Sequence, residues 1–380
     1  MRPGAEQFPT TGWPWRPGND FRLLDGGGEF FGRMLAAIDA ARAHVLLEMY
    51  LVSSGEVAAA FIEALTRARR RGVRCCVLFD GFGALGLANA DRRRLQEAGV
   101  ELRIFNPLRW RNRLRNFLRD HRKLLTLDGE VAFVGGAGLA DEFAPGPEAW
   151  RELMLEIRGP VVADWQRAFA RTWRRCGPDL TLPEAAIAPL PGGATGRLAL
   201  SEARQRSVLA RGVLRRVDAA HTRVWIMSAY FVPSRRLRKA LRRAARRGVD
   251  VRLLVPSERT DHPWVRQAAR RLYGRMLRNG VRIFEYQPRV LHAKMILCDD
   301  WVSIGSSNLD RWSFQWNLEA NQEVADPAVA AAAAAAFAGD FAVSRALSRR
   351  HWPRRAWVDR LRERIAGALD RWLEGWRRPP

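Results

Sequence analysis

Cysteine, histidine and lysine are all scarce in this chain of 380 residues. Its four cysteines include no C-x-x-C pair, so the sequence predicts neither a disulfide framework nor a zinc site, and it fits a reducing compartment. Arginine supplies nearly all of the 64 basic residues, and only Lys123, Lys239 and Lys294 are lysines. A lysine retained against this background is a candidate for a role that arginine cannot fill, with chance survival as the alternative.

Long apolar runs are also absent. No stretch reaches the roughly 18 consecutive apolar residues of a membrane-spanning helix, and the first twenty residues contain no run typical of a signal peptide. The alanine-rich stretch 328–338 is too short to span and predicts a helix of a folded domain. The net charge of +24 favours an anionic partner, either nucleic acid or an acidic membrane surface. If the partner is a membrane, we expect the protein to lie on its surface.

The two halves of the chain carry the same order of predicted strands and helices. Strands that alternate with helices are typical of α/β proteins in which helices cover both faces of a sheet. Repetition of the whole series indicates an internal duplication. In the first half, strands are expected at 44–52, 73–81 and 100–107, with a helix at 55–72 and a short helix that ends at residue 99. In the second half, strands are expected at 222–232, 249–257 and 281–288, with helices at 235–248 and 262–280.

We therefore predict an α/β fold made of two tandem repeats with mixed, largely parallel sheets. A stretch rich in Pro, Gly and Ala reads as the connection between the repeats. The predicted division assigns residues 1–182 to the first repeat, 183–203 to the linker, 204–350 to the second repeat and 351–380 to a basic amphipathic C-terminal helix.

The pattern H-x-K-x₄-D occurs twice, after the last predicted strand of each repeat, where chance predicts about 0.002 matches. Residues two apart on a β-strand point to the same side, so each His and Lys should project into one cleft. Small residues follow each copy and allow backbone N–H groups and hydroxyls to approach a phosphate. The residues are His121, Lys123 and Asp128, then Gly135 and Gly136, and His292, Lys294 and Asp299, then Gly305, Ser306, Ser307 and Asn308.

Paired motifs of this kind, the second continuing into GSSN, resemble the phospholipase D superfamily. The phrases GNDFRLLDGGGEFF, LLEMY and LHAKMILCDDWVSIGSSNLD resemble the shorter bacterial cardiolipin synthases, which lack transmembrane helices. The resemblance covers nearly the whole chain. It implies two phospholipase D-like α/β/α repeats packed as a pseudo-dimer around one active site.

The resemblance also implies a phosphohistidine mechanism that needs no metal or other cofactor. One histidine attacks phosphorus, and the other protonates the leaving alcohol and then deprotonates the incoming one. By analogy with relatives His121 is assigned as the nucleophile and His292 as the acid/base, and the reverse assignment stays open. Lys123 and Lys294 are expected to stabilise the non-bridging oxygens of the transition state.

Further residues are expected to support the motifs. The resemblance implies that Glu319 in NLEAN and Glu152 in WRELML orient the imidazoles, with a solvated surface charge as the alternative for each. The motif aspartates Asp128 and Asp299 are predicted as members of the catalytic set, with support of neighbouring loops as the alternative role. The first motif departs from the family at Gly138, where relatives usually carry an asparagine that bonds near the phosphate, whereas Asn308 keeps that place in the second.

As donor and acceptor the resemblance implies phosphatidylglycerol, which would give cardiolipin and free glycerol at the cytoplasmic face of the bacterial inner membrane. The protein would be peripheral there. A phospholipase D-type hydrolase of lipids, a nuclease and a non-catalytic lipid-binding protein are the alternatives. No nucleic-acid module is recognised, so we expect no nucleic-acid partner.

Two segments are candidates for contact with lipid. The C-terminal segment 357–378 combines an apolar stripe with many arginines, which suits either a lipid interface or packing on the core. Residues 108–120 interleave aromatic, leucine and arginine side chains and suit headgroups or a nucleic-acid groove. The C-terminal stripe comprises Trp357, Leu361, Ile365, Ala368, Leu369, Trp372 and Trp376.

Overall fold

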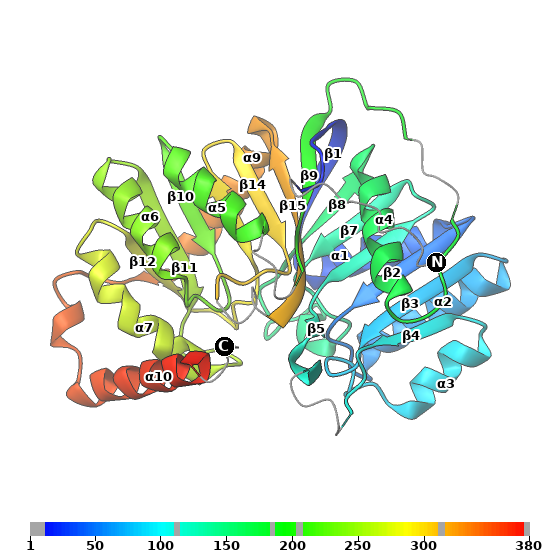
Figure 1. The fold of residues 1–380 in the computed structure, drawn as a ribbon, viewed down its shortest axis with the longest axis horizontal. Coiled ribbons are helices and arrows are strands. Elements are labelled where there is room, and N and C mark those ends of the chain that lie inside the picture. Colours follow the sequence, from blue (N-terminus) through cyan, green and yellow to red (C-terminus); the bar gives the residue numbers. More distant parts are fainter. Residues whose placement is uncertain (1–11, 110–114, 183–186, 203–207, 311–315, 376–380) are drawn as a thin grey trace, which may run out of the picture.

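A computed structural model describes residues 12–109, 115–182, 187–202, 208–310 and 316–375 (Figure 1). In the first repeat, three parallel strands are followed by an antiparallel series, and helices pack on both faces of the sheet. The parallel strands are β2 (His44–Met49), β3 (Arg74–Asp80) and β4 (Glu101–Phe105), and the antiparallel strands are β6 (Lys123–Leu127), β7 (Val131–Gly135), β8 (Leu153–Arg158) and β1 (Arg16–Asp25). The helices are α1 (Gly27–Ala40), α2 (Glu56–Arg70), α3 (Asn89–Glu97) and α4 (Val161–Arg174), with a short 3₁₀ turn at Asp141–Phe143.

The second repeat follows the same plan and carries two additions at its end. Its parallel strands are β10 (Arg223–Met227), β11 (Asp250–Pro256) and β12 (Arg282–Tyr286), and the antiparallel series is β13 (Met295–Cys298), β14 (Trp301–Gly305), β15 (Asn317–Ala325) and β9 (Ala194–Ser201). The helices are α5 (Val208–Ala219), α6 (Arg235–Arg246), α7 (Pro263–Leu277) and α9 (Pro327–Ala342). The additions are β16 (Ser344–Ala346) and, after a 3₁₀ turn at Trp352–Arg354, α10 (Trp357–Gly375).

The α/β class is confirmed, with one difference in the sheets. Most pairings among the described strands are antiparallel, whereas the sequence suggested largely parallel sheets. The parallel pairings are confined mainly to the triplets β2–β3–β4 and β10–β11–β12. Each later series folds back as hairpins, and β1 joins β9 so that one ladder runs through both repeats. β9 itself lies within the stretch that we expected to be a linker.

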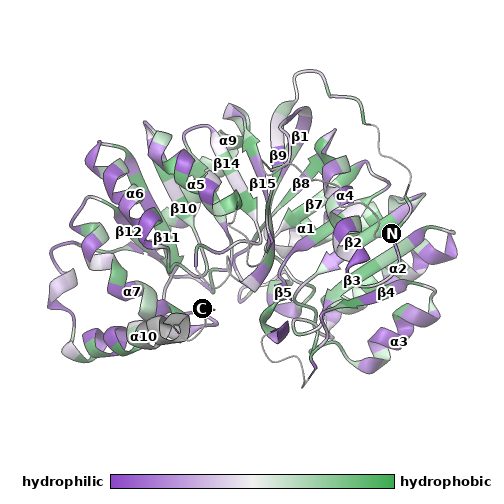
Figure 2. Cartoon of the chain, viewed as in Figure 1, coloured by the Kyte–Doolittle hydropathy of each residue, from purple (hydrophilic) through white to green (hydrophobic). Residues whose placement is uncertain are grey.

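Local sequence explains why these elements form. β2 is buried along its whole length, as expected for a strand covered on both faces. Helix α6 buries one stripe of Leu237, Ala240, Leu241 and Ala244 while its arginines face outward. The Ser234 hydroxyl accepts the Leu237 N–H and caps the start of α6. Figure 2 shows the general result, with apolar strands inside and polar helix faces outside.

The two repeats pack face to face across a shared apolar core. Strands β7 and β8 of the first repeat contact β14 of the second. The shared cluster joins Trp165 and Phe169 to Leu318 and Ala320, and all four are buried. The Trp165 indole N–H donates to the side chain of Gln322 across the interface at 2.8 Å. As a result the C-terminal ends of both parallel triplets point to the same side of the molecule (Figure 1).

Candidate active site

Each motif histidine lies where its chain segment crosses onto the other repeat. The short strand β5 (Arg119–Asp120) pairs with β15, and the His121 N–H donates to the Leu318 carbonyl at 3.0 Å. On the other side, the His292 N–H donates to the Arg151 carbonyl at 2.9 Å. We expected both histidines to lie on strands, but β6 and β13 begin at Lys123 and Met295, after them. The crossing explains the difference, because the histidine segments bond to the other repeat instead of their own sheet.

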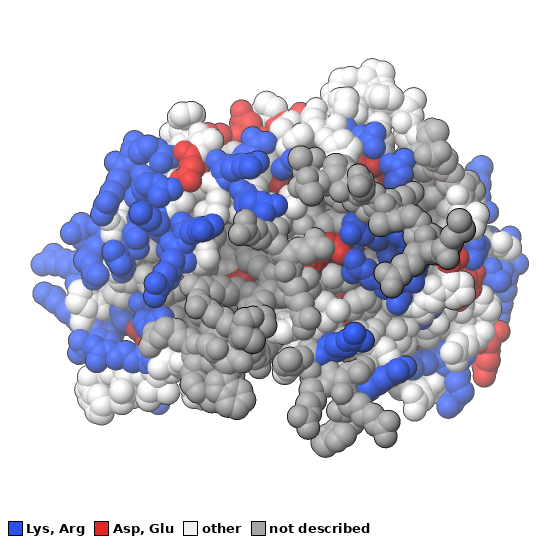
Figure 3. All heavy atoms as spheres, viewed as in Figure 1, with Lys and Arg blue, Asp and Glu red and all other residues white. Residues whose placement is uncertain are grey.

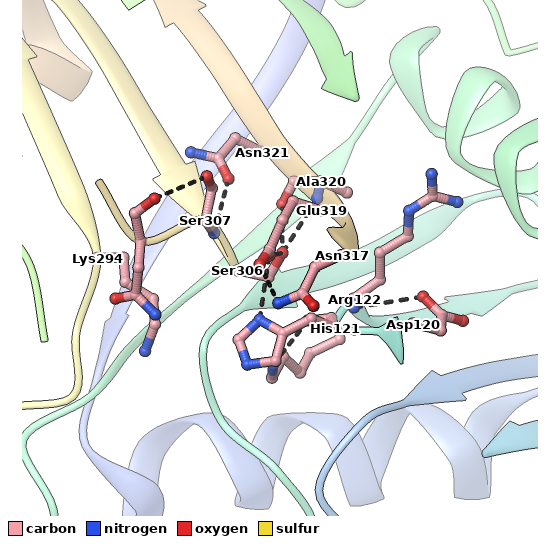
Figure 4. Close-up of polar contacts among 12 residues, drawn as sticks. Asp120, His121, Arg122, Lys294, Ser306, Ser307, Asn317, Glu319, Ala320 and Asn321 are labelled. Carbon is pink, nitrogen blue, oxygen red and sulfur yellow. Dashed lines mark hydrogen bonds and ion pairs between the residues drawn. The ribbon is translucent and has the colours of Figure 1, made fainter. Parts of the chain in front are cut away.

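The crossing gives each imidazole a carboxylate from the opposite repeat. His121 Nδ1 lies 3.1 Å from Glu319 Oε2, and His292 Nδ1 lies 2.6 Å from Glu152 Oε2. Both carboxylates are buried. Since a carboxylate accepts, it holds a proton on Nδ1 and leaves the Nε2 lone pair available. Figure 4 shows the first pair, with the Ser306 hydroxyl donating to the same Glu319 oxygen at 2.5 Å.

The two lysines fold back along their own motifs. Lys123 Nζ donates to the His121 carbonyl at 2.6 Å, and Lys294 Nζ donates to the His292 carbonyl. Lys294 Nζ also lies 3.2 Å from His292 Nε2 and 3.6 Å from Glu152. The i, i+2 spacing therefore does bring each lysine to the side of its histidine.

Electrostatic interactions join the two motifs into one buried site. Burial, opposed by the attraction of Glu319 and aided by the positive charge of Lys294, lowers the pKa of Lys123 to about 7. Burial likewise lowers the pKa of His121, against the attraction of Glu319. Burial and then Lys294 lower the pKa of His292 to about 4. Charged groups of the second repeat therefore shift the pKa values of His121 and Lys123 in the first motif, as expected for one common site.

This site favours an anionic ligand. Burial would raise the pKa of Glu152, but Lys294 and His292 outweigh it and hold the pKa below its ordinary value. The ammonium groups, in contrast, are disfavoured by burial. A phosphodiester anion would offset that cost and stabilise both lysines in their charged form.

The motif aspartates lie at the far ends of the strands from the histidines. Asp128, with φ of 54°, accepts the backbone N–H groups of Arg42, Ala43 and His44 at 2.8–2.9 Å. Asp299, with φ of 50°, binds the N–H groups of residues 221–223 in the same way. Both join the turn after a motif strand to the start of the neighbouring parallel strand. Their place in the signature is thus structural, and they are not part of the reacting centre.

The small residues after the first motif make room for Glu152. A Cβ on Gly136 would lie 2.3 Å from Glu152 Oε2, and one on Gly135 would lie 2.6 Å from the Leu153 carbonyl. At Gly138 a Cβ would lie 2.6 Å from the Leu51 carbonyl oxygen, so an asparagine at this position would not fit without a backbone shift. The first half-site has therefore adapted to glycine at this position.

The second half-site keeps its polar side chains. Asn308 Oδ1 accepts the Tyr230 N–H at 3.3 Å, and the Ser307 N–H donates to Asn321 at 3.2 Å. Gly305 leaves no space for a Cβ beside the Ala320 carbonyl, which would lie 2.3 Å away. The two half-sites are thus alike in backbone and different in side chains.

Aromatic residues around the histidines were missed by the sequence analysis. The Tyr50 ring lies 4.6 Å from the His121 ring and 5.0 Å from Lys123 Nζ. Burial raises the pKa of Tyr50 to about 12, so its hydroxyl stays neutral. Phe143 and Trp150 each lie 5.3 Å from the His292 ring. Aligning the repeats with each other would have pointed to Tyr50, because EMYLV and SAYFV place a tyrosine at the same position.

Comparison with known proteins agrees with this geometry. The family described as "Cardiolipin synthase, PLD-like domain" matches residues 34–173 and 213–341, so each match contains one motif. The chain belongs to this family. Within it, Cardiolipin synthase A of Pseudomonas putida (strain GB-1) is 38% identical over 310 residues, and Cardiolipin synthase B of Salmonella typhi is 37% identical over 312.

The extent of the matches differs between relatives. The alignment covers 80% of this phospholipase D-like chain but only 64% of the Pseudomonas protein, and 78% and 74% of the two chains for the Salmonella protein. The crystal structure of phosphatidylserine synthase from Haemophilus influenzae Rd KW20 matches 93% of each chain with a TM-score of 0.72 and 14% identity, which shows a shared fold. Among the described helices none is both long and apolar enough to cross a membrane. The described residues also contain no group of three or more His, Cys, Asp or Glu side chains that could hold a metal.

Proposed function

We propose that the protein is a phosphatidyltransferase of the cardiolipin synthase type. It would move a phosphatidyl group from one phosphatidylglycerol to another and release glycerol. The observation that carries this proposal is the pair of crossed His–Glu contacts with both lysines in one buried site. The names of the relatives support the choice of substrate.

In the first step His121 Nε2 attacks phosphorus and the P–O bond to glycerol breaks. Glu319 holds the proton on Nδ1 and stabilises the positive charge that develops on the ring. His292 gives a proton to the departing glycerol oxygen. The bound phosphodiester offsets the charge of Lys294, which raises the pKa of His292 and allows it to carry that proton.

In the second step an alcohol of the acceptor phosphatidylglycerol attacks the phosphohistidine. His292, now neutral, removes the alcohol proton, and His121 departs as a neutral imidazole. Lys123 and Lys294 stabilise the non-bridging oxygens in both steps. Water at the same position would give phosphatidic acid, so the outcome depends on what reaches the buried phosphohistidine.

The proposed partner is an anionic phospholipid, met by a peripheral protein on the cytoplasmic face of the inner membrane. All four cysteines are free, and three of them are buried, which agrees with a reducing compartment. The net charge of +24 agrees with an acidic surface.

The proposal is tested by incubating the purified protein with labelled phosphatidylglycerol vesicles and identifying the products. Cardiolipin and glycerol are expected; phosphatidic acid alone would make the protein a hydrolase, and cleavage of plasmid DNA with no lipid product would make it a nuclease. His121→Ala and His292→Ala should each lower turnover by at least about 10³-fold. Near-normal turnover in either variant would rule out the two-histidine scheme. Enzyme denatured during turnover at neutral or alkaline pH, where the P–N bond survives, should carry the phosphatidyl group on His121, and the same group on His292 would reverse the two roles.

A further inference from the structure

Helix α10 turns its apolar stripe away from the protein. Trp357 is 68% exposed, and Leu361 and Ile365 are also exposed. The opposite side of the helix packs on α7, where Ala366 and Glu363 are buried and the Arg270 guanidinium donates to Glu363 at 3.3 Å. Of the two roles that the sequence allowed for this stripe, packing on the core therefore does not apply to residues 357–365. The side chains of Leu369, Trp372 and Trp376 lie outside the described residues.

Arginines border the exposed stripe on both sides. At 100° per residue, Arg360 and Arg364 lie on one side of it and Arg362 on the other. All three are exposed. Figure 3 shows basic side chains over much of the left half of the molecule and uncharged residues along its lower left edge. An apolar stripe between cations is the pattern of a helix that lies in a lipid interface.

Most of the other large exposed apolar side chains follow the C-terminal ends of parallel strands. Phe82 and Leu85 follow β3, Leu108 follows β4, and Trp264, 66% exposed, begins α7 after β11. These loops extend from the C-terminal ends of the parallel strands, which is also where the motif histidines lie. Seven of the nine large apolar side chains that are exposed among the described residues are on these loops, at the start of α7 or on α10. Leu190 and Val343 are the two exceptions.

Cations are interleaved with these side chains as well. Arg109 and Arg115 are exposed beside Leu108, and Arg259 is exposed in the loop that leads to Trp264. We call the edge formed by these loops and the exposed side of α10 the docking face.

We propose that the docking face seats on an anionic lipid bilayer, with the active site directed at the headgroups. This inference rests on the proposed function and names the surface through which the enzyme would reach its substrate. Exposed Trp, Leu and Ile gain free energy when they enter the interfacial region, whereas a nucleic-acid backbone offers them no apolar partner. The bordering arginines match the negative charge of the headgroups. The bilayer is therefore the occupant that fits both parts of the face.

The test is co-sedimentation of the full chain with vesicles of phosphatidylglycerol and phosphatidylcholine, compared with vesicles of phosphatidylcholine alone. The wild type should prefer the anionic vesicles, and its affinity should fall as salt increases. The double variant Trp357→Ala/Ile365→Ala should bind at least about tenfold more weakly. The matched control is Leu190→Ala/Val343→Ala, which removes two exposed apolar side chains outside the docking face and should bind like the wild type. Both variants should unfold at the wild-type temperature and keep wild-type turnover of a dispersed short-chain phosphatidylglycerol.

Wild-type vesicle binding by the Trp357→Ala/Ile365→Ala variant would overturn the inference, and so would an equal loss in the control. Binding of a DNA duplex that the same variant weakens equally would assign the face to nucleic acid instead. The catalytic variant His121→Ala separates this inference from the proposed function. It should bind vesicles with wild-type affinity and form no product, and a lack of product from the wild type would contradict the function while leaving its vesicle binding in place.

Discussion

At the scale of residues, the main feature of the site is that each imidazole depends on a carboxylate from the other repeat. A carboxylate that holds the Nδ1 proton fixes the tautomer and orientation of a catalytic histidine. Glu319→Gln should therefore lower kcat by about 10²–10⁴-fold with a much smaller change in KM. It should also alter the titration of the His121 imidazole in NMR spectra.

A matched control for this variant lies on the same strand. Glu323 is buried on β15 and pairs with Arg197 at 2.6 Å, away from both histidines. Glu323→Gln should destabilise the fold to some extent but leave the His121 titration unchanged. Equal effects of the two substitutions on that titration would mean that Glu319 acts only through the stability of β15.

The depressed pKa of Lys123 predicts a pH dependence. Its ammonium is present below pH 7 and is lost as the pH rises through about 7. In the free enzyme, kcat/KM should thus fall above pH 7, whereas kcat should hold to higher pH because a bound phosphodiester raises the lysine pKa. Lys123→Arg keeps the charge, so its lower activity should lack the decline near pH 7. An unchanged profile in that variant would assign the decline to another group.

The sequence and its family resemblance were sufficient to predict the ionisable residues that gather, but not the aromatic residues around them or the crossing of the chain. The repeated H-x-K pattern and the two glutamates identified His121, His292, Glu152 and Glu319, and all four lie in the site. The crossing could not be predicted, because it depends on segment 119–121 bonding to β15, a contact between residues almost 200 positions apart.

At the scale of elements, each motif strand connects the active site at its start to a structural turn at its end. The lysine lies at or directly before its start, and the turn at its end holds an aspartate that binds the neighbouring parallel strand. The spacing that the two copies of H-x-K-x₄-D share is thus about the length of one short strand with its turn. The aspartate acts on the site only through the position of that strand.

Asp299 offers a test of this division. Burial would raise its pKa, but hydrogen bonds from Thr222 and from three backbone N–H groups lower it to about 2. Asp299→Ala should destabilise the protein by about 2–3 kcal/mol at neutral pH, because those N–H groups lose their acceptor. The lowered pKa means that the wild-type advantage is full above about pH 4 and is lost as the pH falls toward 2. Denaturant unfolding at several pH values measures this.

The control for that experiment is the next residue. Asp300 is 67% exposed and only weakly paired to Arg223 at 3.9 Å, so Asp300→Ala should change stability by less than about 0.5 kcal/mol. The difference in unfolding free energy between Asp299→Ala and the wild type should become smaller in acid. If it did not, the ionised carboxylate of Asp299 would not be what stabilises the turn.

Element positions were well predicted from periodicity, and strand pairing was not. Helices α2, α6 and α7 begin and end within three residues of the expected bounds. Their signals are local: each has an apolar stripe and a glycine just past its end, and α6 also has a serine cap. Pairing direction depends on distant partners, which explains the unexpected antiparallel ladders. The strand at residues 194–201 was missed because the Pro- and Gly-rich composition of the stretch before it favoured a linker.

At the scale of the whole molecule, catalysis depends on the core between the repeats, since only their packing brings the motifs together. Trp165 is buried there and donates to Gln322 across the interface. Trp165→Phe should cost about 1–3 kcal/mol, because Gln322 loses its donor and a small cavity remains. Turnover should fall before secondary structure is lost, as a comparison of activity with far-UV circular dichroism during denaturant titration would show. Simultaneous loss of both signals would mean that the repeats do not separate before they unfold.

The exchange of carboxylates has a consequence for the origin of the protein. A single repeat by itself would complete neither half-site, so an unduplicated form would need to pair with a second copy and exchange glutamates with it. Once two copies are joined in one chain, their sequences no longer have to be the same, and a substitution in one repeat leaves the other unchanged. Gly136 opposite Ser306 and Gly138 opposite Asn308 record that divergence.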